Sequence, residues 1–243
     1  MLARSEYDSI FQKERTHSYP IIDMYERMHE FAIDRDRLES MARILACPLK
    51  VNPPNWQHGR VLYTTLRFFL ERLFKPTVDI ALLVDIGTAK GFSACVMSHA
   101  AADAKKVAQI VSIDVVNPNA RVPRNSVAEI DGLLSIPEFV NRYVVANDSL
   151  SVDFVGGGST KWLELAMKMQ TRIPFAFVDG KHTYEQVKFE AAALAKCQQP
   201  GDVVMFDDCQ IEPVGRAVRE IALDYELRYI DIGPRNYCIA VRQ

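Results

Sequence analysis

Apolar and polar positions divide the chain into two parts with different periodicities. Over residues 1–75, apolar side chains recur three and four residues apart, which is the spacing of an amphipathic helix. The clearest runs contain Ile22, Tyr25, Met28, Phe31 and Ala32, and then Leu62, Leu66, Phe69, Leu70 and Leu73. Prolines within residues 47–55 indicate a loop between these runs. The pattern predicts an N-terminal helical extension, which we assign to residues 1–77.

From residue 78 onward, short apolar runs alternate with helical segments. Uninterrupted apolar runs of this length are typical of strands that are buried on both faces of a parallel sheet. The predicted strands are 80–86, 109–114, 143–146, 174–179 and 202–207, and the predicted helices are 91–102, 159–170, 183–197 and 213–223. This alternation predicts a doubly wound, Rossmann-like parallel sheet.

Two further strand-like runs, 228–232 and 237–241, end the chain with only four residues between them. A connection that short requires an antiparallel pair. The predicted fold class is therefore α/β, with a parallel sheet that ends in an antiparallel hairpin over residues 78–243.

Composition narrows the function classes. The chain has 243 residues, of which 49% are apolar, and its net charge is −2. A protein with this charge has no overall basic surface for nucleic acid. The net charge does not exclude a local basic groove. No apolar run is long enough to span a bilayer, so we expect no membrane partner. The N-terminus does not resemble a signal peptide. The five cysteines form no C-x-x-C pair, and we expect reduced thiols in a cytoplasmic protein.

Aspartates end or closely follow most of the predicted parallel strands. They are Asp85, Asp114, Asp179, Asp207 and Asp208. Aspartate commonly starts turns and caps helices, which would explain one or two of them. Ligands of open parallel sheets bind at the carboxyl ends of the strands, so five aspartates across four strand ends are better explained by a shared ligand site.

The loop after the first strand, residues 85–93, carries two glycines four positions apart, Gly87 and Gly91. Glycine permits a tight turn and a close approach of the backbone to a ligand. The loop does not match the G-x-G-x-x-G fingerprint, so an NAD-binding domain is less favoured. Asp114 can accept hydrogen bonds from ribose hydroxyls, a role that serves NAD and S-adenosylmethionine (SAM) equally.

Four segments in this order carry a more specific resemblance. They are Val-Asp-Ile-Gly-Thr-Ala-Lys-Gly-Phe-Ser (84–93), Val-Ser-Ile-Asp (111–114), Phe-Val-Asp-Gly-Lys-His-Thr-Tyr-Glu-Gln-Val (177–187) and Pro-Gly-Asp-Val-Val-Met-Phe-Asp-Asp (200–208). The series resembles class I SAM-dependent methyltransferases, in particular the family that includes macrolide and aminocoumarin sugar O-methyltransferases and a cephalosporin-hydroxylase-associated protein. It is more distantly similar to catechol-type O-methyltransferases. The resemblance covers residues 78–243.

The resemblance implies a set of SAM-binding residues. Asp85, Gly87 and Gly91 would shape the pocket for the methionine part, and Thr88 and Ser93 would line it. The remaining assignments place Asp114 at the ribose, Asn147, Asp148 and Ser149 at the adenine with Asp148 near its amine, and Asp179 beside the cofactor.

The resemblance also implies a divalent metal, Mg²⁺, held by Asp179, Asp207 and Asp208, and a general base at His182, with Asp179 in the catalytic centre. Mg²⁺ prefers oxygen ligands, and it makes a nearby hydroxyl acidic enough for a histidine to deprotonate. Several related enzymes have Asn where Asp208 stands, which leaves open that one of the two adjacent aspartates is structural. His182 could also simply cap a helix or face solvent.

Other segments receive structural interpretations. Residues 52–55 are interpreted as a proline loop, and residues 156–158 as a flexible loop that leads into a helix cap. Residues 115–127 are irregular and could cover an acceptor pocket, as could the N-terminal helices, which could instead form a dimer interface.

The predicted activity is metal-assisted O-methylation of a small hydroxylated molecule such as a sugar, a phenol or a natural-product hydroxyl. Two alternatives remain: a protein of the same fold that binds SAM without transferring methyl, and a nucleic-acid methyltransferase, which the net charge disfavours.

Overall fold

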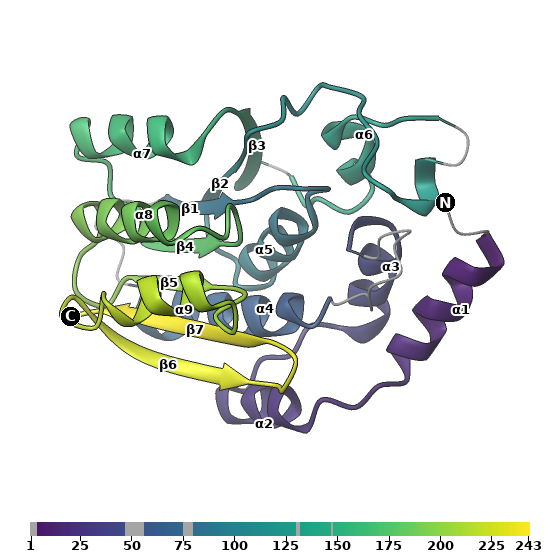
Figure 1. Ribbon diagram of the computed structural model, residues 1–243, viewed down its shortest axis with the longest axis horizontal. Helices are drawn as coiled ribbons and strands as arrows, with labels where there is room; N and C mark the ends of the chain where they lie inside the picture. The colour runs from purple at the N-terminus through teal and green to yellow at the C-terminus, as the bar shows by residue number, and fades with distance from the viewer. Residues whose placement is uncertain (1–3, 47–55, 75–79, 130–131, 147) are drawn as a thin grey trace.

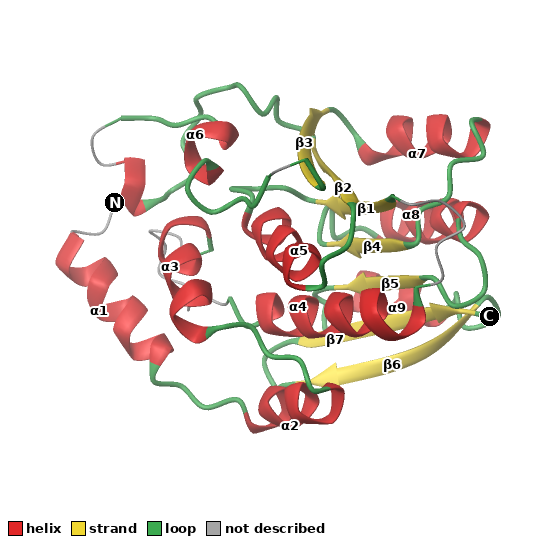
Figure 2. Cartoon of the chain, turned by 180° about the vertical axis from the view of Figure 1, so that it is seen from behind, coloured by secondary structure: helices red, strands yellow, loops and turns green. Residues whose placement is uncertain are grey.

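A seven-stranded sheet with helices on both faces forms the centre of the protein (Figures 1 and 2). The computed structural model describes residues 4–46, 56–74, 80–129, 132–146 and 148–243. In the sheet the strands follow the order β3-β2-β1-β4-β5-β7-β6. Their bounds are β1 Ala81–Ile86, β2 Ala108–Asp114, β3 Leu150–Gly156, β4 Phe175–Val178, β5 Val203–Phe206, β6 Tyr225–Asp231 and β7 Asn236–Arg242.

Strands β1 to β5 are parallel, and β7 runs antiparallel to both β5 and β6. The prediction of a doubly wound parallel sheet that ends in an antiparallel hairpin is confirmed. The order reverses between β1 and β4, so a crevice is expected at the carboxyl ends of these two strands.

The third strand differs from its prediction. The segment 143–146 continues the turn after α6 (Ile136–Val140), and the amides of Tyr143 and Val144 donate to the carbonyl of Val140. Strand β3 begins at Leu150 instead. It lies at the edge of the sheet, and its sequence alternates exposed and half-buried residues, so it has no continuous apolar run. The half-buried loop 143–146, which has a continuous apolar run, was therefore predicted as the strand in its place.

The helices between the strands follow the prediction closely. They are α5 Phe92–Asp103, α7 Ser159–Lys168, α8 Tyr184–Cys197 and α9 Glu212–Arg219. Helix α9 is shorter than predicted, because the chain makes turns after Arg219. A short 3₁₀ turn, Val127–Glu129, and α6 lie in the connection between β2 and β3.

The N-terminal extension is helical, as predicted. It contains α1 Arg4–Arg15, α2 Pro20–His29, α3 Arg35–Leu45 and α4 His58–Phe68, and α4 continues into a π-helical turn, Phe69–Leu73. Helix α2 ends before Phe31 and Ala32, because Glu30 adopts a left-handed conformation with φ of 63°. The proline loop predicted at 52–55 lies outside the described residues.

Two hydrophobic cores cover the two faces of the sheet. Successive strand side chains point to opposite faces. Phe177 and Met205 accordingly face a core that contains the buried residues of α1 to α5, whereas Val178 and Phe206 face a core formed with α7, α8 and α9. The N-terminal helices therefore share one continuous core with the strands of the sheet.

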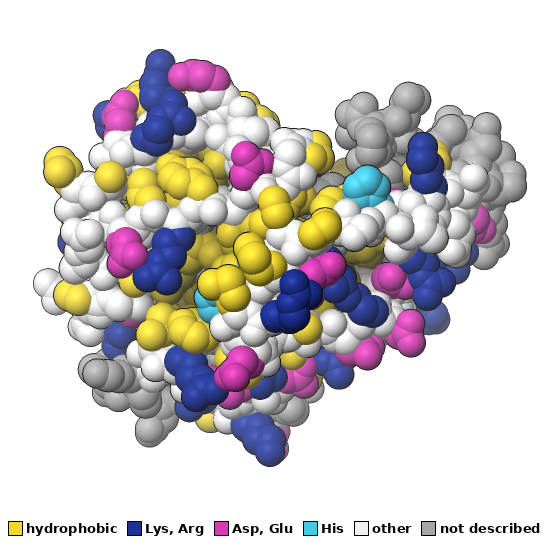
Figure 3. Space-filling view, turned by 90° about the horizontal axis from the view of Figure 1, so that it is seen from below, with side chains coloured by type: hydrophobic (Ala, Val, Ile, Leu, Met, Phe, Trp, Pro, Cys, Tyr) yellow, Lys and Arg dark blue, Asp and Glu magenta, His cyan; other side chains and the backbone are white. Residues whose placement is uncertain are grey.

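An apolar hollow lies beside the outer hairpin of β6 and β7. Its volume is about 240 Å³, and its lining includes Tyr25, Met28, His29 and Tyr229. Figure 3 shows the hydrophobic side chains that gather on this side of the molecule, around a partly visible histidine. This surface belongs to α2 and β6, which contact each other.

Within the described ranges, no helix is both long enough and apolar enough to cross a lipid bilayer. Four cysteines, Cys95, Cys197, Cys209 and Cys238, are buried free thiols, in agreement with the expectation of reduced cysteines. Cys47 lies outside the described residues.

Candidate active site

The loop after β1 depends on its two glycines. Gly87 has φ of +106°, and a Cβ atom there would lie 2.1 Å from the carbonyl oxygen of Asp179. Gly91 has φ of +87° at the start of α5, and its Cβ would lie 2.5 Å from Cγ1 of Val140. Both positions therefore need glycine, since any side chain would collide with the end of β4 or with α6.

Asp85 lies beneath this loop and supports it. Its side chain is fully buried, its Oδ2 accepts a hydrogen bond of 2.6 Å from Ser112, and the Ser112 hydroxyl lies 2.7 Å from that of Thr88. Burial raises the pKa of Asp85 to about 6, although hydrogen bonds from Ser112 and Ser93 oppose the shift. Thr88 and Ser93 are themselves buried, so this group of side chains fixes the loop from below.

A pocket of about 430 Å³ opens at the carboxyl ends of the first four strands. Asp114 contributes to its wall, and its two carboxylate oxygens accept hydrogen bonds of 2.9 Å from the amides of Ala89 and Val116. Gly157 to Thr160 border the pocket at the start of α7, and Gln186 and Glu190 border it from α8. The pocket therefore lies on the face of the sheet that α7 and α8 cover.

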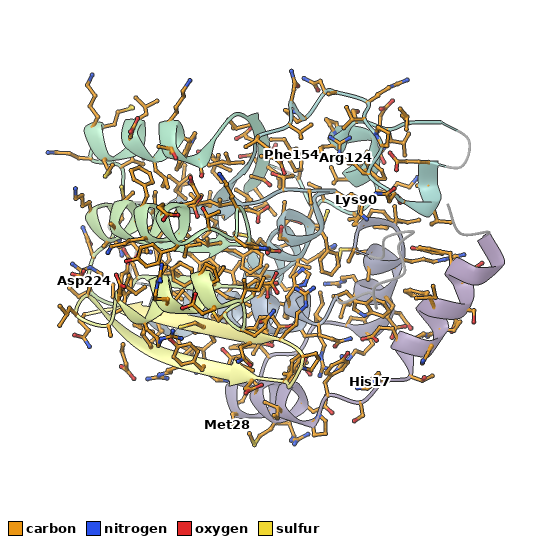
Figure 4. The ribbon with its side chains drawn as sticks, viewed as in Figure 1. His17, Met28, Lys90, Arg124, Phe154 and Asp224 are labelled. Atoms are coloured by element: carbon orange, nitrogen blue, oxygen red, sulfur yellow. The ribbon has the colours of Figure 1, made fainter. Side chains whose placement is uncertain are left out.

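The stretch 115–127 is tied to this loop by Arg124. Its Nε donates to the carbonyl of Ala89 at 3.3 Å, and its Nη1 donates to the carbonyls of Ala120 and Leu134. Arg124 and Phe154 both border a small hollow beside Ala89 (Figure 4). The irregular stretch is therefore held against the loop after β1.

The structure contradicts the assignment of Asp148 and Ser149 to the adenine site. Both precede β3, and the carbonyl of Ser149 accepts a hydrogen bond from the amide of Ala108, where β2 begins. They thus lie at the amino ends of the parallel strands, on the opposite edge from the pocket. Asn147 is outside the described residues. The misplaced third strand caused this error, and the residues after the true β3 are 157–160, which were interpreted as a plain loop and helix start.

A cluster of acidic and histidine side chains follows β4 and β5. Nε2 of His182 lies 3.4 Å from Oδ1 of Asp179 and 3.4 Å from Oδ2 of Asp208. One ligand atom from each of these three residues lies within 4.8 Å of the others. Asp207 was predicted in the same set, but it lies deeper, where its Oδ1 accepts a 2.6 Å hydrogen bond from the amide of Asp208.

The acidic cluster is only partly compensated by positive charge. Burial and the nearby carboxylates of Asp179 and Asp208 raise the pKa of Asp207 well above its ordinary value. Arg235, in the turn between β6 and β7, places Nη1 2.8 Å from Oδ1 of Asp208 and 3.9 Å from Oδ2 of Asp207. A hydrogen bond to Asp179 raises the pKa of His182, and burial partly opposes this effect.

Sequence reasoning missed two members of this site, His58 and Arg235. Nδ1 of His58, at the start of α4, lies 3.9 Å from Oδ2 of Asp207, and its ring stacks on Phe177 at 6.0 Å. Burial lowers the pKa of His58 to about 4, so the ring is neutral at pH 7. Neither residue has a motif around it, and both are brought here only by tertiary packing.

Comparison with known proteins supports a specific family. A family model described as a methyltransferase domain matches residues 84–209, just over half of the chain. The chain belongs to this methyltransferase family. It is a class I SAM-dependent methyltransferase, as its segments at 84–93, 111–114, 177–187 and 200–208 indicated. The search of curated proteins gave no match.

Several solved methyltransferase structures have the same fold as this protein, although their sequences are only distantly similar. An O-methyltransferase from Bacillus cereus in complex with SAH has 13% identity and a TM-score of 0.53, with 94% of this chain and 93% of that chain covered. A putative O-methyltransferase from Klebsiella pneumoniae has 12% identity and a TM-score of 0.55, with 95% and 93% covered. The O-methyltransferase NovP has 18% identity and a TM-score of 0.50, with 74% and 79% covered.

Proposed function

We propose that this methyltransferase transfers the methyl group of SAM to a hydroxyl oxygen of a small molecule, with the help of a divalent cation such as Mg²⁺. One observation carries the proposal. Asp179 borders the 430 Å³ pocket and also lies beside His182 and Asp208, so a single residue joins a cofactor-sized pocket to an acid–base cluster. Two of the proteins with similar solved structures are named O-methyltransferases, which agrees with an oxygen acceptor.

The cofactor is proposed to lie along the carboxyl ends of β1, β2 and β4. Asp114 is the candidate ligand of the ribose hydroxyls, since its carboxylate stands in the pocket wall. The loop of Gly87 and Gly91 would hold the methionine part, with Asp85, Thr88 and Ser93 supporting it from below. The adenine is proposed to lie between the start of α7 and the first turns of α8. This location replaces the earlier assignment of the adenine site to Asp148 and Ser149.

The acidic cluster fits a divalent cation. Oδ2 of Asp207 is buried and has no hydrogen-bond partner among the described residues, and three carboxylates face a single guanidinium. Carboxylate oxygens are the donors that Mg²⁺ prefers. Asp179 and Asp208, with Asp207 behind them, are the proposed ligands, and a cation there would lower the pKa of a nearby acceptor hydroxyl.

The chain's own residues supply proton transfer and positioning. His182 is half-exposed, so it can reach an acceptor, and Asp179 orients its ring. A histidine with a pKa near neutral is suited to remove the proton of an acidified hydroxyl. Holding the oxygen in line with the methyl group is mainly a matter of position, which the fixed strand ends favour.

The acceptor is proposed to bind on the side of the N-terminal helices. His58 reaches the acidic cluster from α4, and the strand positions that end in Asp179 and Asp207 point toward the core of those helices. Residues 1–77 and 115–127 remain the predicted cover of this region. A homodimer and a cytoplasmic location likewise remain predictions.

The test is methyl transfer from SAM to a panel of sugars, phenols and catechols, measured by mass spectrometry. We expect a product with Mg²⁺, no product with a chelator, and a loss of at least about a hundredfold in Asp207→Ala, which removes a ligand of a stabilising cation. Asp36→Ala, which changes an exposed aspartate on α3, is the control and should keep full activity.

Two results would contradict this proposal in different ways. Folded protein that binds no SAM by calorimetry would remove the cofactor assignment altogether. Tight SAM binding without product and without any effect of metal would favour the alternative, a binding protein of the same fold.

A further inference from the structure

Glu190 is a buried carboxylate that borders the cofactor pocket from α8. It is only 1% exposed, and it lies one helical turn after Gln186, which borders the same pocket. Within the described part of the chain, the groups that act on its charge are the hydrogen-bond donors Ser159 and Gln186, and no lysine or arginine is among them. A buried carboxylate without a cation is costly unless hydrogen-bond donors satisfy it.

Only one of its two oxygens is satisfied. Oε1 accepts a hydrogen bond of 2.6 Å from the hydroxyl of Ser159 and one of 2.9 Å from Nε2 of Gln186. Oε2 is buried and has no partner among the residues that the structure describes. An amide oxygen would serve Ser159 and Gln186 equally well, so the scaffold alone does not require a carboxylate here.

The location of Glu190 indicates which donor could fill this gap. Its neighbours in the pocket include Ser159 at the start of α7, which follows β3, and Gly180 after β4, where a Cβ atom would lie 3.9 Å from Oε1 of Glu190. The ribose hydroxyls have Asp114 as their candidate partner. The remaining N–H donor on the nucleoside part of SAM is the 6-amino group of adenine.

We propose that Oε2 of Glu190 accepts a hydrogen bond from the 6-amino group of the cofactor's adenine, and that Glu190 thereby selects an adenosine cofactor. This inference rests on the placement of adenosine proposed above. Glu190 acts as a specificity residue, and Ser159 and Gln186 hold its carboxylate in place. Burial raises the pKa of Glu190, and a donor at Oε2 would stabilise its charged form.

The test compares two probes by calorimetry: S-adenosylhomocysteine (SAH) and S-inosylhomocysteine, in which a carbonyl replaces the 6-amino group. We expect the wild-type protein to bind SAH roughly tenfold to a hundredfold more tightly, the range for one hydrogen bond to a charged group. In Glu190→Gln, the side-chain amide can turn its NH₂ toward the inosine carbonyl. The ratio of the two affinities should therefore fall to about one or invert.

The control is Glu185→Gln, an exposed glutamate of the same helix, which should keep the wild-type ratio. A wild-type ratio near one overturns the role of Glu190, and this result needs no variant. An unchanged ratio in Glu190→Gln overturns it as well, because a merely structural residue would weaken both ligands equally. If the folded wild-type protein binds neither probe, the proposed cofactor site itself fails.

Discussion

Asp85 is a charged residue in a place that disfavours charge. It has no exposed surface, and burial raises its pKa from 3.8 to about 6. Because the folded state holds the proton more strongly than the unfolded state, stability falls as the pH rises from about 4 to about 6. The loss persists above pH 6, so Asp85 destabilises the protein at neutral pH while it supports the cofactor loop.

We therefore expect Asp85→Asn to increase the free energy of unfolding at pH 7 by about 1–3 kcal/mol, since one unit of pKa shift corresponds to about 1.4 kcal/mol. The gain should disappear below about pH 4, where the wild-type carboxyl is protonated in both states. Urea unfolding between pH 4 and 8 measures the effect. A variant that is less stable than the wild type at pH 7 would contradict this account. Calorimetry should show weaker SAH binding, because the amide brings an additional donor among the buried hydroxyls of Ser112 and Thr88 that support the loop.

Individual site residues were predictable where the topology brings them together. The carboxyl ends of parallel strands meet at one edge, so Asp114, Asp179 and Asp208 could be placed from the strand pattern alone. His58 and Arg235 could not be placed, since no local signal links an N-terminal helix or a hairpin turn to that edge. Asp148 and Ser149 were placed wrongly because their position depended on the end of one misassigned strand.

A buried ionic network links helix α2 to helix α4. Arg60 is 2% exposed, and its Nε donates to Oε1 of Glu26 at 2.8 Å. Arg35 also donates to Glu26, at 3.0 Å, but its side chain is 46% exposed. Removing one partner of a buried ion pair leaves an uncompensated buried charge, which lowers stability more than removing both partners does.

Arg60→Met should lower the free energy of unfolding by about 3 kcal/mol, because Glu26 stays buried with little compensation. The double variant Arg60→Met/Glu26→Leu should recover part of this loss, since both charges are then gone. Arg35→Met is the matched control, and it should change stability by at most about 1 kcal/mol, because Arg35 is half-exposed and Arg60 still pairs with Glu26. Urea unfolding measures all three, and equal losses in Arg60→Met and Arg35→Met would refute the distinction.

Most elements were predictable because buried strands and amphipathic helices differ in period. Strands β1, β4 and β5 are buried at nearly every position and gave clear apolar runs. The edge strand β3 alternates in exposure, so its sequence looks like that of a polar connection. A short apolar run alone does not distinguish a strand from a partly buried loop, which is why 143–146 was predicted to be the third strand.

At the scale of the whole molecule, the boundary between residues 1–77 and 78–243 does not separate two cores. Val61, Leu62 and Leu66 of α4 belong to the same buried cluster as Leu83 and Phe177 of the sheet. Phe11 of α1 stacks on Trp56 at 5.0 Å within it. One face of the sheet therefore depends on the N-terminal helices for its cover.

We predict that residues 78–243 expressed alone will not unfold cooperatively, because α5 and one face of the sheet would be exposed to water. Thermal unfolding followed by circular dichroism, together with binding of a hydrophobic dye, tests this against the full chain. A fragment with a sharp transition and intact SAH binding would show instead that the extension is a separate unit.

The proposed cofactor and the proposed acceptor meet at the carboxyl ends of the strands but have different helices around them. The cofactor pocket is bordered by α7 and α8, whereas His58 reaches the acidic cluster from the opposite face. With the acceptor placed as proposed, substitutions on the N-terminal helices would change the choice of acceptor without altering the residues of α7 and α8 that border the cofactor pocket. On this proposal, related proteins with the same fold would differ in acceptor while they keep one site for the methyl donor.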